Sequence, residues 1–382
     1  MNTNRTRERQ SCPEKLYEQD ERTVPLSDKE PSLCLKEPSL CLVRQGCCGA
    51  GKMVYFAAEK QREGQHMPDV AVHAAFGREV LAGLDSEIAE RIREVPYTFA
   101  LFGPDLWFMY QPWKRREGRG RRMHTTRTGQ FLTALARRAK NSPHPEEMFS
   151  YLAGFLCHYA LDAETHPYII YMTEERTHFP RGHMSFEHTL DRLEMERAGV
   201  WGEKHPVTDH YFPKLQLPAC MKADIDAVFE EVYGWKHCWK ALNISGPRYR
   251  MCYRVLENPM GLFSRLAGRT GHPVLRSLAY PHSHYEGTDA ENTQHAEWTH
   301  SHEPSEKSTA AFADMKETAR KNAEDMIRTA YRYVFLSGIT EEELAGRIGN
   351  RSYLSGLPVD DPRNTAVSFL LPPQKEERIR NK

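Results

Sequence analysis

Histidines and carboxylates in the middle of the chain recur at a spacing of four residues. The stretch HYALDAETHPYI places His158, Asp162 and His166 at successive steps of four. The stretch HMSFE repeats the step with His183 and Glu187. On an α-helix, residues four apart project from nearly the same face and are separated by about 6 Å along the axis. Imidazole and carboxylate groups that converge in this way are typical zinc ligands.

The surroundings of these residues favour a metal over ordinary ion pairs. A histidine four residues from an acid is commonly a surface pair, and any one of these steps alone fits that interpretation. His158 and Asp162, however, belong to the apolar run YLAGFLCHYAL and its continuation, which indicates a buried face. Burying a carboxylate there without a partner would be costly. The repeated pattern therefore predicts a cluster of metal ligands.

Two more residues are candidates for this cluster. The stretch FGPDLWFM places Asp105 between a glycine–proline turn and large apolar side chains. The stretch RMHTTRTG places His124 at the entrance of a predicted helix. Taken alone, each has an ordinary explanation, as an aspartate that stabilises a turn and as a hydrogen-bonded histidine.

The elements that would position these side chains are helices. Apolar residues recur every three to four positions from Met67 onward, whereas the alternation typical of strands is scarce. Pro167 favours an end or a kink of one helix at His166, because the residue before a proline resists helical angles. The sequence predicts an all-α, multi-helix domain with long loops. Helices are expected over residues 73–95, 128–140, 183–199, 222–242, 308–336 and 340–349, and from Pro145 onward, with the longest loop at about 270–307.

The composition excludes several classes of protein. The 52 basic and 52 acidic residues balance, so the chain gives no strong nucleic-acid signal. Hydrophobic residues at 40% suit a globular protein, and no stretch approaches the ~20 apolar residues of a transmembrane helix. The charged amino-terminal stretch MNTNRTRERQ precedes no signal-peptide core, which predicts a cytoplasmic location. The nine cysteines form no spaced framework and are expected to be free thiols.

Three regions are predicted along the chain. Residues 1–66 contain the heptapeptide KEPSLCL twice in succession and no helical period. They are expected to be a disordered or non-native N-terminal extension. Residues 67–360 are expected to form the helical domain, and residues 361–382 a polar C-terminal tail.

From Met67 onward the chain resembles the zinc-dependent phospholipase C family of the bacterial, phosphatidylcholine-hydrolysing type. The same helical fold occurs in single-strand-specific zinc nucleases. The resemblance covers about residues 67–195, and its stretches occur in family order. They are HAAFGREVL, FGPDLWF, MHTTRTG, HYALDAETHPYI and HMSFEHTLD.

The resemblance implies a centre of two or three Zn²⁺ ions. It also implies that Asp105 is the general base or orients the attacking water. The implied ligands are Asp105, His124, His158 and Asp162 for a first zinc, His166, His183 and Glu187 for a second, and His73 for a third, with Asp162 bridging the third to the first.

Two departures from the family pattern affect these expectations. Secreted members complete the third zinc site with an amino-terminal tryptophan, and no tryptophan precedes His73 here. Choline-lipid enzymes carry a tyrosine that faces the headgroup after the residue equivalent to Asp105, and Leu106 stands there in this chain. The occupancy of the third site and a preference for choline lipids are therefore open.

The implied function is a zinc-dependent phosphodiester hydrolase of the phospholipase C type, in which zinc-bound hydroxide attacks phosphorus. Zinc lowers the pKa of bound water to near neutrality, and two zincs ~3.5–4 Å apart can hold the attacking and leaving oxygens in line. The partner would be a phosphodiester substrate, with a phospholipid headgroup as one case. The alternatives are a nuclease, a phospholipase D-like hydrolase on the same scaffold, or a non-catalytic helical protein with structural zinc. The basic run Lys114–Arg122 is interpreted as a solvated loop or as a cationic lip for phosphate-bearing substrates.

Overall fold

The fold of the described residues is all-α, as the sequence predicts. The computed structural model describes residues 70–110, 118–173, 182–257, 265–266, 269, 280 and 289–366. The strands among them are two residues long: β1 (Trp298–Thr299) pairs antiparallel with β2 (Lys307–Ser308), with Trp298 opposite Ser308. The predicted extension 1–66 and most of the predicted tail 361–382 lie outside the described residues, so the three proposed regions stay predictions.

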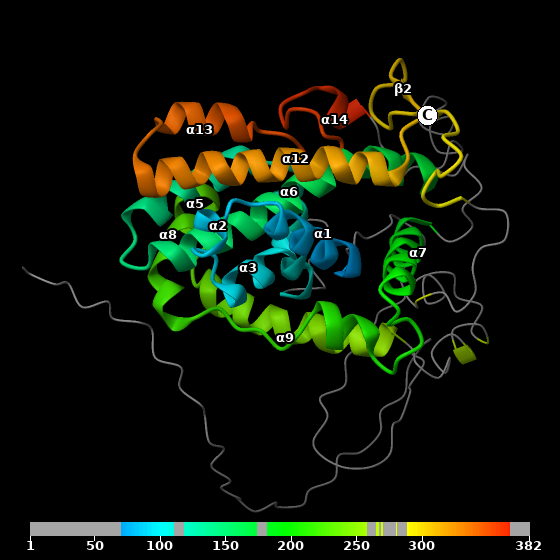
Figure 1. Cartoon of the computed structure of the whole chain (residues 1–382), viewed down its shortest axis with the longest axis horizontal. Coiled ribbons are helices and arrows are strands. Elements are labelled where there is room, and N and C mark those ends of the chain that lie inside the picture. The colour runs from blue at the N-terminus through cyan, green and yellow to red at the C-terminus, as the bar shows by residue number, and fades with distance from the viewer. Residues whose placement is uncertain are drawn as a thin grey trace, which may run out of the picture. The chain divides into compact units, whose positions relative to one another are not determined.

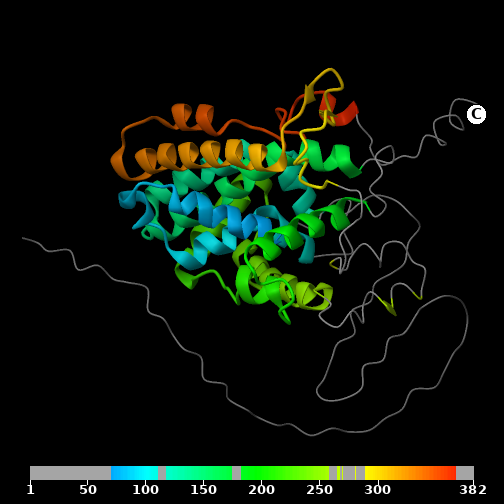
Figure 2. The same cartoon turned by 45° about the vertical axis from the view of Figure 1, so that its right-hand side comes forward.

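One long helix, α6 (Pro145–Thr173), lies at the centre of the described fold. Every residue from Met148 to Ala163 is buried. A helix that is buried on all sides must be covered by other elements. The helices α3 (Glu94–Ala100), α5 (Thr128–Asn141) and α12 (Phe312–Tyr331) pack against it. Figures 1 and 2 show α12 along one side of α6 and α3 on the other.

The central helix continues through Pro167 and does not end at His166. Proline lacks the N–H that would bond the carbonyl four residues earlier, which here belongs to Ala163. Arg351 replaces that donor, because its Nη2 lies 3.3 Å from Ala163 O. Gly356 allows this approach, since its φ is +67° and a Cβ there would lie 2.5 Å from Ala163 O. A segment far along the chain therefore compensates for the proline.

Two helices flank the carboxyl half of α6. These are α1 (Val70–Ala82) and α7 (Gly182–Arg197), which also pack against each other. The helix predicted over 73–95 is divided, because α1 ends before Gly83 and is followed by α2 (Ser86–Ala89) and then by α3.

The predicted helix 222–242 is likewise two helices, α8 (Lys222–Tyr233) and α9 (Cys238–Leu256). Gly234 ends α8 with φ +72°, and its N–H bonds the carbonyls of Phe229 and Glu230. Shorter elements complete the described fold: η1 (Gly103–Met109), α4 (Arg119–Thr125), η3 (Val207–Tyr211), η4 (Ala219–Met221), η5 (Arg332–Leu336), α13 (Glu341–Ile348) and α14 (Arg363–Ala366).

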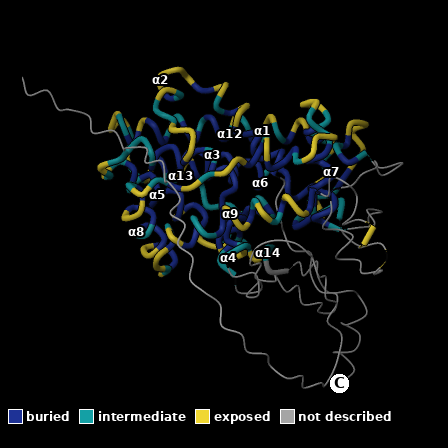
Figure 3. Tube along the Cα trace, turned by 90° about the horizontal axis from the view of Figure 1, so that it is seen from below, coloured by how far each residue is buried: buried dark blue, intermediate teal, exposed yellow. Residues whose placement is uncertain are grey.

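The buried residues form one continuous core. Figure 3 shows buried positions along α6, α1 and α3, and exposed positions mainly at the outer turns. The core residues of these helices belong to a single hydrophobic cluster. Among the described residues, no helix is both long enough and apolar enough to cross a lipid bilayer.

Candidate metal centre

The structure brings all eight predicted ligands into one buried cluster. Each side chain is nearly inaccessible to solvent, and contacts of 3.8 Å or less join the whole set. The residues come from five elements: His73 from α1, Asp105 from η1, His124 from α4, His158, Asp162 and His166 from α6, and His183 and Glu187 from α7. Their role as zinc ligands stays a prediction.

Asp105 joins two of the histidines. Its Oδ1 lies 3.1 Å from His124 Nε2, and its Oδ2 lies 3.2 Å from His158 Nε2. The turn that places it depends on Gly103, whose φ is +40° and whose missing Cβ would lie 2.7 Å from His158 Cγ. A side chain at this position would push the turn away from His158. The glycine therefore allows the aspartate to reach its partner.

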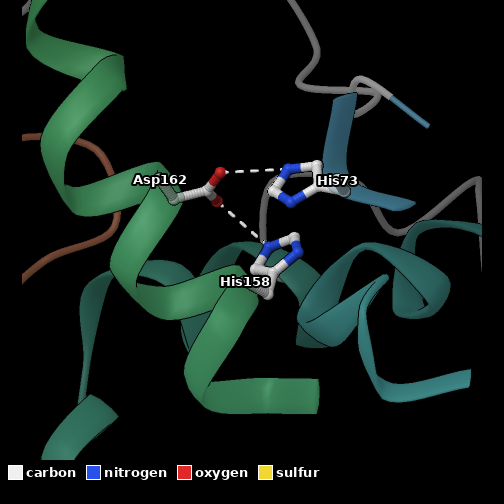
Figure 4. Close-up of side chains that lie close together, drawn as sticks. All are labelled: His73, His158 and Asp162. Carbon is white, nitrogen blue, oxygen red and sulfur yellow. Dashed lines mark ion pairs between the residues drawn. The ribbon is translucent and has the colours of Figure 1, made fainter. Parts of the chain in front are cut away.

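Asp162 lies between His73 and His158, with one oxygen directed at each (Figure 4). Its Oδ1 is 3.2 Å from His73 Nε2, and its Oδ2 is 3.0 Å from His158 Nε2. The two imidazole rings stack with their centroids 4.2 Å apart. A carboxylate in this position has the arrangement expected of a bridge between two metal ions.

The remaining three ligands form a neighbouring group. Glu187 Oε1 lies 2.8 Å from His183 Nε2 and 3.6 Å from His166 Nε2. The imidazole rings of His166 and His183 are nearly parallel. His166 also connects this group to the others, since its Nδ1 lies 3.5 Å from Asp162 Oδ1.

Backbone carbonyls orient two of the imidazoles. The Nδ1 of His158 lies 2.9 Å from Leu101 O, and the Nδ1 of His124 lies 2.8 Å from Gly120 O. An Nδ1–H that donates to a carbonyl leaves Nε2 free to act as a ligand, which is the usual arrangement behind metal-bound histidine. In both residues it is Nε2 that faces the carboxylates.

The donor set fits zinc. The nitrogen and oxygen atoms fall into groups of three whose members lie within 4.8 Å of one another. Asp105 Oδ2 and Glu187 Oε2 are buried and accept no hydrogen bond from the described residues. Such atoms are rare in folded proteins, because burying a polar atom without a partner costs free energy. A cation held among these groups would satisfy both oxygens.

The pKa values of the cluster depend on burial and on mutual contact. Burial opposes protonation of His158, but Asp162 and Asp105 raise the pKa of this imidazole to about 9. Burial raises the pKa of the Glu187 carboxyl to about 8 and lowers the pKa of His183 to about 4. The site therefore holds protons at neutral pH that a metal ion would have to displace.

A cavity with walls of two kinds borders the cluster. One part of its lining is made of the metal-ligand candidates, and the rest is apolar except for Thr165. The apolar part consists of Val72, Leu161, Ile169 and Phe312.

Two residues near the cluster were missed in the sequence. Asp191 is buried on α7, and its Oδ1 accepts hydrogen bonds from the N–H groups of Ala71 and Val72, at 2.7 and 3.0 Å. Tyr280 donates its hydroxyl to Asp191 Oδ2. The carboxylate thus holds the first turn of α1, which also carries His73. Its position four residues after Glu187, on the same helix face, was the available signal.

Tyr353 is the second residue that sequence analysis missed. Its ring centroid lies 5.3 Å from that of His124 and 5.7 Å from that of His158. Its N–H also donates to the backbone carbonyl of His124, at 2.9 Å. The residue lies beyond the stretch that resembles the family, and no local pattern marks it.

The described part of the basic run Lys114–Arg122 includes an arginine that packs against aromatic rings. Residues 114–117 lie outside the described residues. The Arg119 guanidinium lies 4.8–4.9 Å from the ring centroids of Trp107, Tyr110 and Trp235. It is therefore packed in an aromatic cage and does not extend into solvent as a lip would.

Comparison with known proteins relates the stretch that carries the cluster to a known family. Residues 72–239 match the family described as zinc dependent phospholipase C, and this stretch contains all eight clustered residues. This part of the chain belongs to the zinc-dependent phospholipase C family. The resemblance seen in the sequence is confirmed, and zinc is the metal that the family and the donor set both indicate. No curated protein and no solved structure matches the chain.

Proposed function

We propose that this phospholipase C family domain hydrolyses phosphodiesters with two or three zinc ions held by the eight clustered residues. The observation that carries the proposal is the position of Asp162, whose two oxygens face His73 and His158 separately. Such a carboxylate supports two adjacent metal positions. Adjacent positions suit in-line displacement at phosphorus, in which the attacking and leaving oxygens both need stabilisation.

The charges of the cluster favour an anionic substrate. Three carboxylates, Asp105, Asp162 and Glu187, balance only part of the charge of two or three divalent ions. The loaded centre would keep a net positive charge in a buried setting, where electrostatic attraction is stronger than in water. A phosphodiester is an anion and would be attracted by this net positive charge.

The residues of the chain would have distinct roles in the reaction. When bound, zinc lowers the pKa of water and stabilises negative charge on phosphoryl oxygens. Asp105 is the residue that we assign to orient the attacking water and take its proton. His124 and His158 are fixed by the carbonyls behind them and hold their Nε2 atoms in place.

The geometry supports an enzyme over a protein with purely structural zinc. Structural zinc sites usually have four protein ligands, whereas catalytic sites have three and leave one position open. The group of His166, His183 and Glu187 contains three. The small cavity beside His166 and Glu187, of about 10 Å³, has room for about one water molecule next to that position.

The choice of headgroup is separate from the reaction type, because metal ligands do not report the leaving group. Leu106 is buried with about 1% of its surface exposed, so it offers no contact to a headgroup. We therefore propose a phosphodiesterase without the choline contact that a tyrosine at this position would provide.

The proposal is tested with an aryl phosphodiester and a panel of phospholipids and single-stranded nucleic acid. Hydrolysis should disappear when the protein is stripped with a chelator and return when zinc is added. The matched aryl phosphomonoester is the control for contaminating phosphatase. Full activity in verified metal-free protein, or zinc-loaded protein that cleaves no diester in the panel, would contradict the proposal.

A further inference from the structure

A second group of zinc-type ligands lies outside the metal centre. His144 directly precedes α6, Glu147 is the third residue of that helix, and Cys220 lies in η4. Their ligand atoms lie within 4.8 Å of one another, and all three residues are half-buried. Glu147 precedes His158 by eleven residues on the same helix, which is roughly 16 Å of helix. The group is therefore separate from the eight clustered residues.

The same separation is visible between the helices. Cys220 lies directly before α8, whereas His183 and Glu187 lie on α7. In Figures 1 and 3, α8 and α7 lie at opposite sides of the described fold.

Other contacts do not account for the His144 ring or the Glu147 carboxylate. Among the described residues, the His144 ring and the Glu147 carboxylate make no hydrogen bond and no ion pair. The neighbouring Glu146, by contrast, pairs with Arg91 and Arg93. An acid in the first turn of a helix is favoured by the helix dipole, which explains Glu147 alone. It does not explain why an imidazole and a thiol lie beside it.

Hydrogen bonds hold the segments that carry the three residues. Ser142 Oγ accepts from the N–H of His144 at 2.9 Å and donates to Asp224 Oδ2 on α8. Arg138 of α5 pairs with the same carboxylate, its Nε lying 2.8 Å from Asp224 Oδ1. The turn before α6 is thus fixed to α8, whose start follows Cys220. Ligands held by such secondary contacts need little reorganisation to bind a metal.

We propose that His144, Glu147 and Cys220 form a separate binding site for a zinc-class divalent ion. The set offers one nitrogen, one oxygen and one sulfur donor, a combination that suits zinc and not magnesium or calcium. A thiolate and a carboxylate neutralise the two charges of the ion, and the thiol proton passes to solvent on binding.

The required movements are small. Zinc bonds of ~2.0–2.3 Å in a tetrahedral shell place donors about 3.3–3.8 Å apart. Ligand atoms within 4.8 Å of one another therefore have to converge by about 1 Å. Half-buried side chains can do this by rotating, and water completes the shell. The ion would tie the start of α6 to the segment before α8.

Cobalt spectroscopy of the full-length protein tests this site. Metal-free protein is titrated with Co²⁺ while the near-ultraviolet charge-transfer band from thiolate to cobalt is recorded. The clustered groups of the main centre contain no sulfur ligand, so the band does not report on them. At saturation the band should have the intensity of one thiolate-bound cobalt per chain, and it should be absent in Cys220→Ser. Cys252→Ser, which removes the thiol of another half-buried cysteine, is the matched control and should keep the band.

Two further variants keep the thiol and remove its neighbours. His144→Gln and Glu147→Gln should each weaken cobalt binding by ~10²-fold or more, because loss of even a supporting group costs 10- to 100-fold. If Cys220→Ser does not fold, these two variants still test whether the three residues bind cobalt together. The inference is overturned if the wild type shows no band, if the band persists in Cys220→Ser, or if both glutamine variants bind cobalt as tightly as the wild type.

Discussion

Asp105 and Asp162 both contact Nε2 of His158. Their roles differ because their other contacts differ. The second oxygen of Asp162 contacts His73, whereas the second oxygen of Asp105 contacts His124. In the proposed centre the first carboxylate supports two metals and the second acts on water. Substitutions of these two aspartates are therefore expected to have different effects on metal content and activity.

Asparagine substitutions distinguish the two roles. Asp162→Asn replaces a bridging anion by a neutral amide and should lower both zinc per chain and thermal stability, because metal binding contributes to folding. Asp105→Asn should keep most of the zinc and lose activity by ~10²-fold or more if this carboxylate is the base. Zinc analysis and turnover are measured on both variants. Full metal content in Asp162→Asn, or a full rate in Asp105→Asn, would show that the roles are wrong.

Zinc binding should be coupled to proton release. In the metal-free protein His158 has a pKa of about 9 and Glu187 a pKa of about 8, so both hold protons at pH 7. Zinc has to displace these protons, so its apparent affinity should rise with pH by roughly tenfold per unit for each proton released, and level off above the two pKa values. Competition with a chelating dye at pH 6, 7 and 8 measures the slope. An affinity that does not change over this range would refute the coupling.

At the scale of helices, the centre depends on how α7 holds α1. Three residues at steps of four on α7 serve it: His183 and Glu187 face the cluster, and Asp191 accepts the N–H groups at the start of α1. The contact fixes the register of α1 and therefore the position of His73. Asp191 is a positioning residue in this arrangement and not a ligand.

Substitution of Asp191 should affect stability and metal content together. Asp191→Ala leaves two buried N–H donors without an acceptor, at a cost of roughly 1–3 kcal/mol each, and frees the start of α1. Zinc per chain should fall as His73 moves away from Asp162. Asp191→Asn keeps an oxygen acceptor and should retain most of both properties. Thermal melting and zinc analysis are the measurements, and an alanine variant with wild-type values for both would argue against the positioning role.

The helices that sequence analysis predicted well are those whose signal is local. The start at Pro145 and the four-residue steps of α6 and α7 follow from helical geometry alone, whereas the division of their ligands into zinc sites was implied by the family resemblance. The break at Gly234 was missed, because the apolar period continues on both sides of a glycine whose positive φ is not visible in the sequence. The sequence left open whether the helix ends or kinks before Pro167, because its continuation depends on Arg351, a partner that is distant in the chain.

Across the whole molecule, the site is assembled from segments that local patterns cannot bring together. Asp105 reaches His158 only because Gly103 permits a close approach, and Tyr353 covers the histidines from beyond the family match. The resemblance supplied the grouping that local spacing could not. It could not supply Asp191 or Tyr353, because neither belongs to the implied ligand set.

The central claim is that the eight clustered residues hold the zinc ions that hydrolyse the substrate. Diffraction from crystals of active, zinc-loaded protein, recorded on both sides of the zinc absorption edge, tests it most directly. The account predicts anomalous peaks among Asp105, His124, His158 and Asp162 and among His166, His183 and Glu187, with any third peak between His73 and Asp162. Crystals of protein that hydrolyses phosphodiesters but shows no anomalous peak among these residues would contradict it.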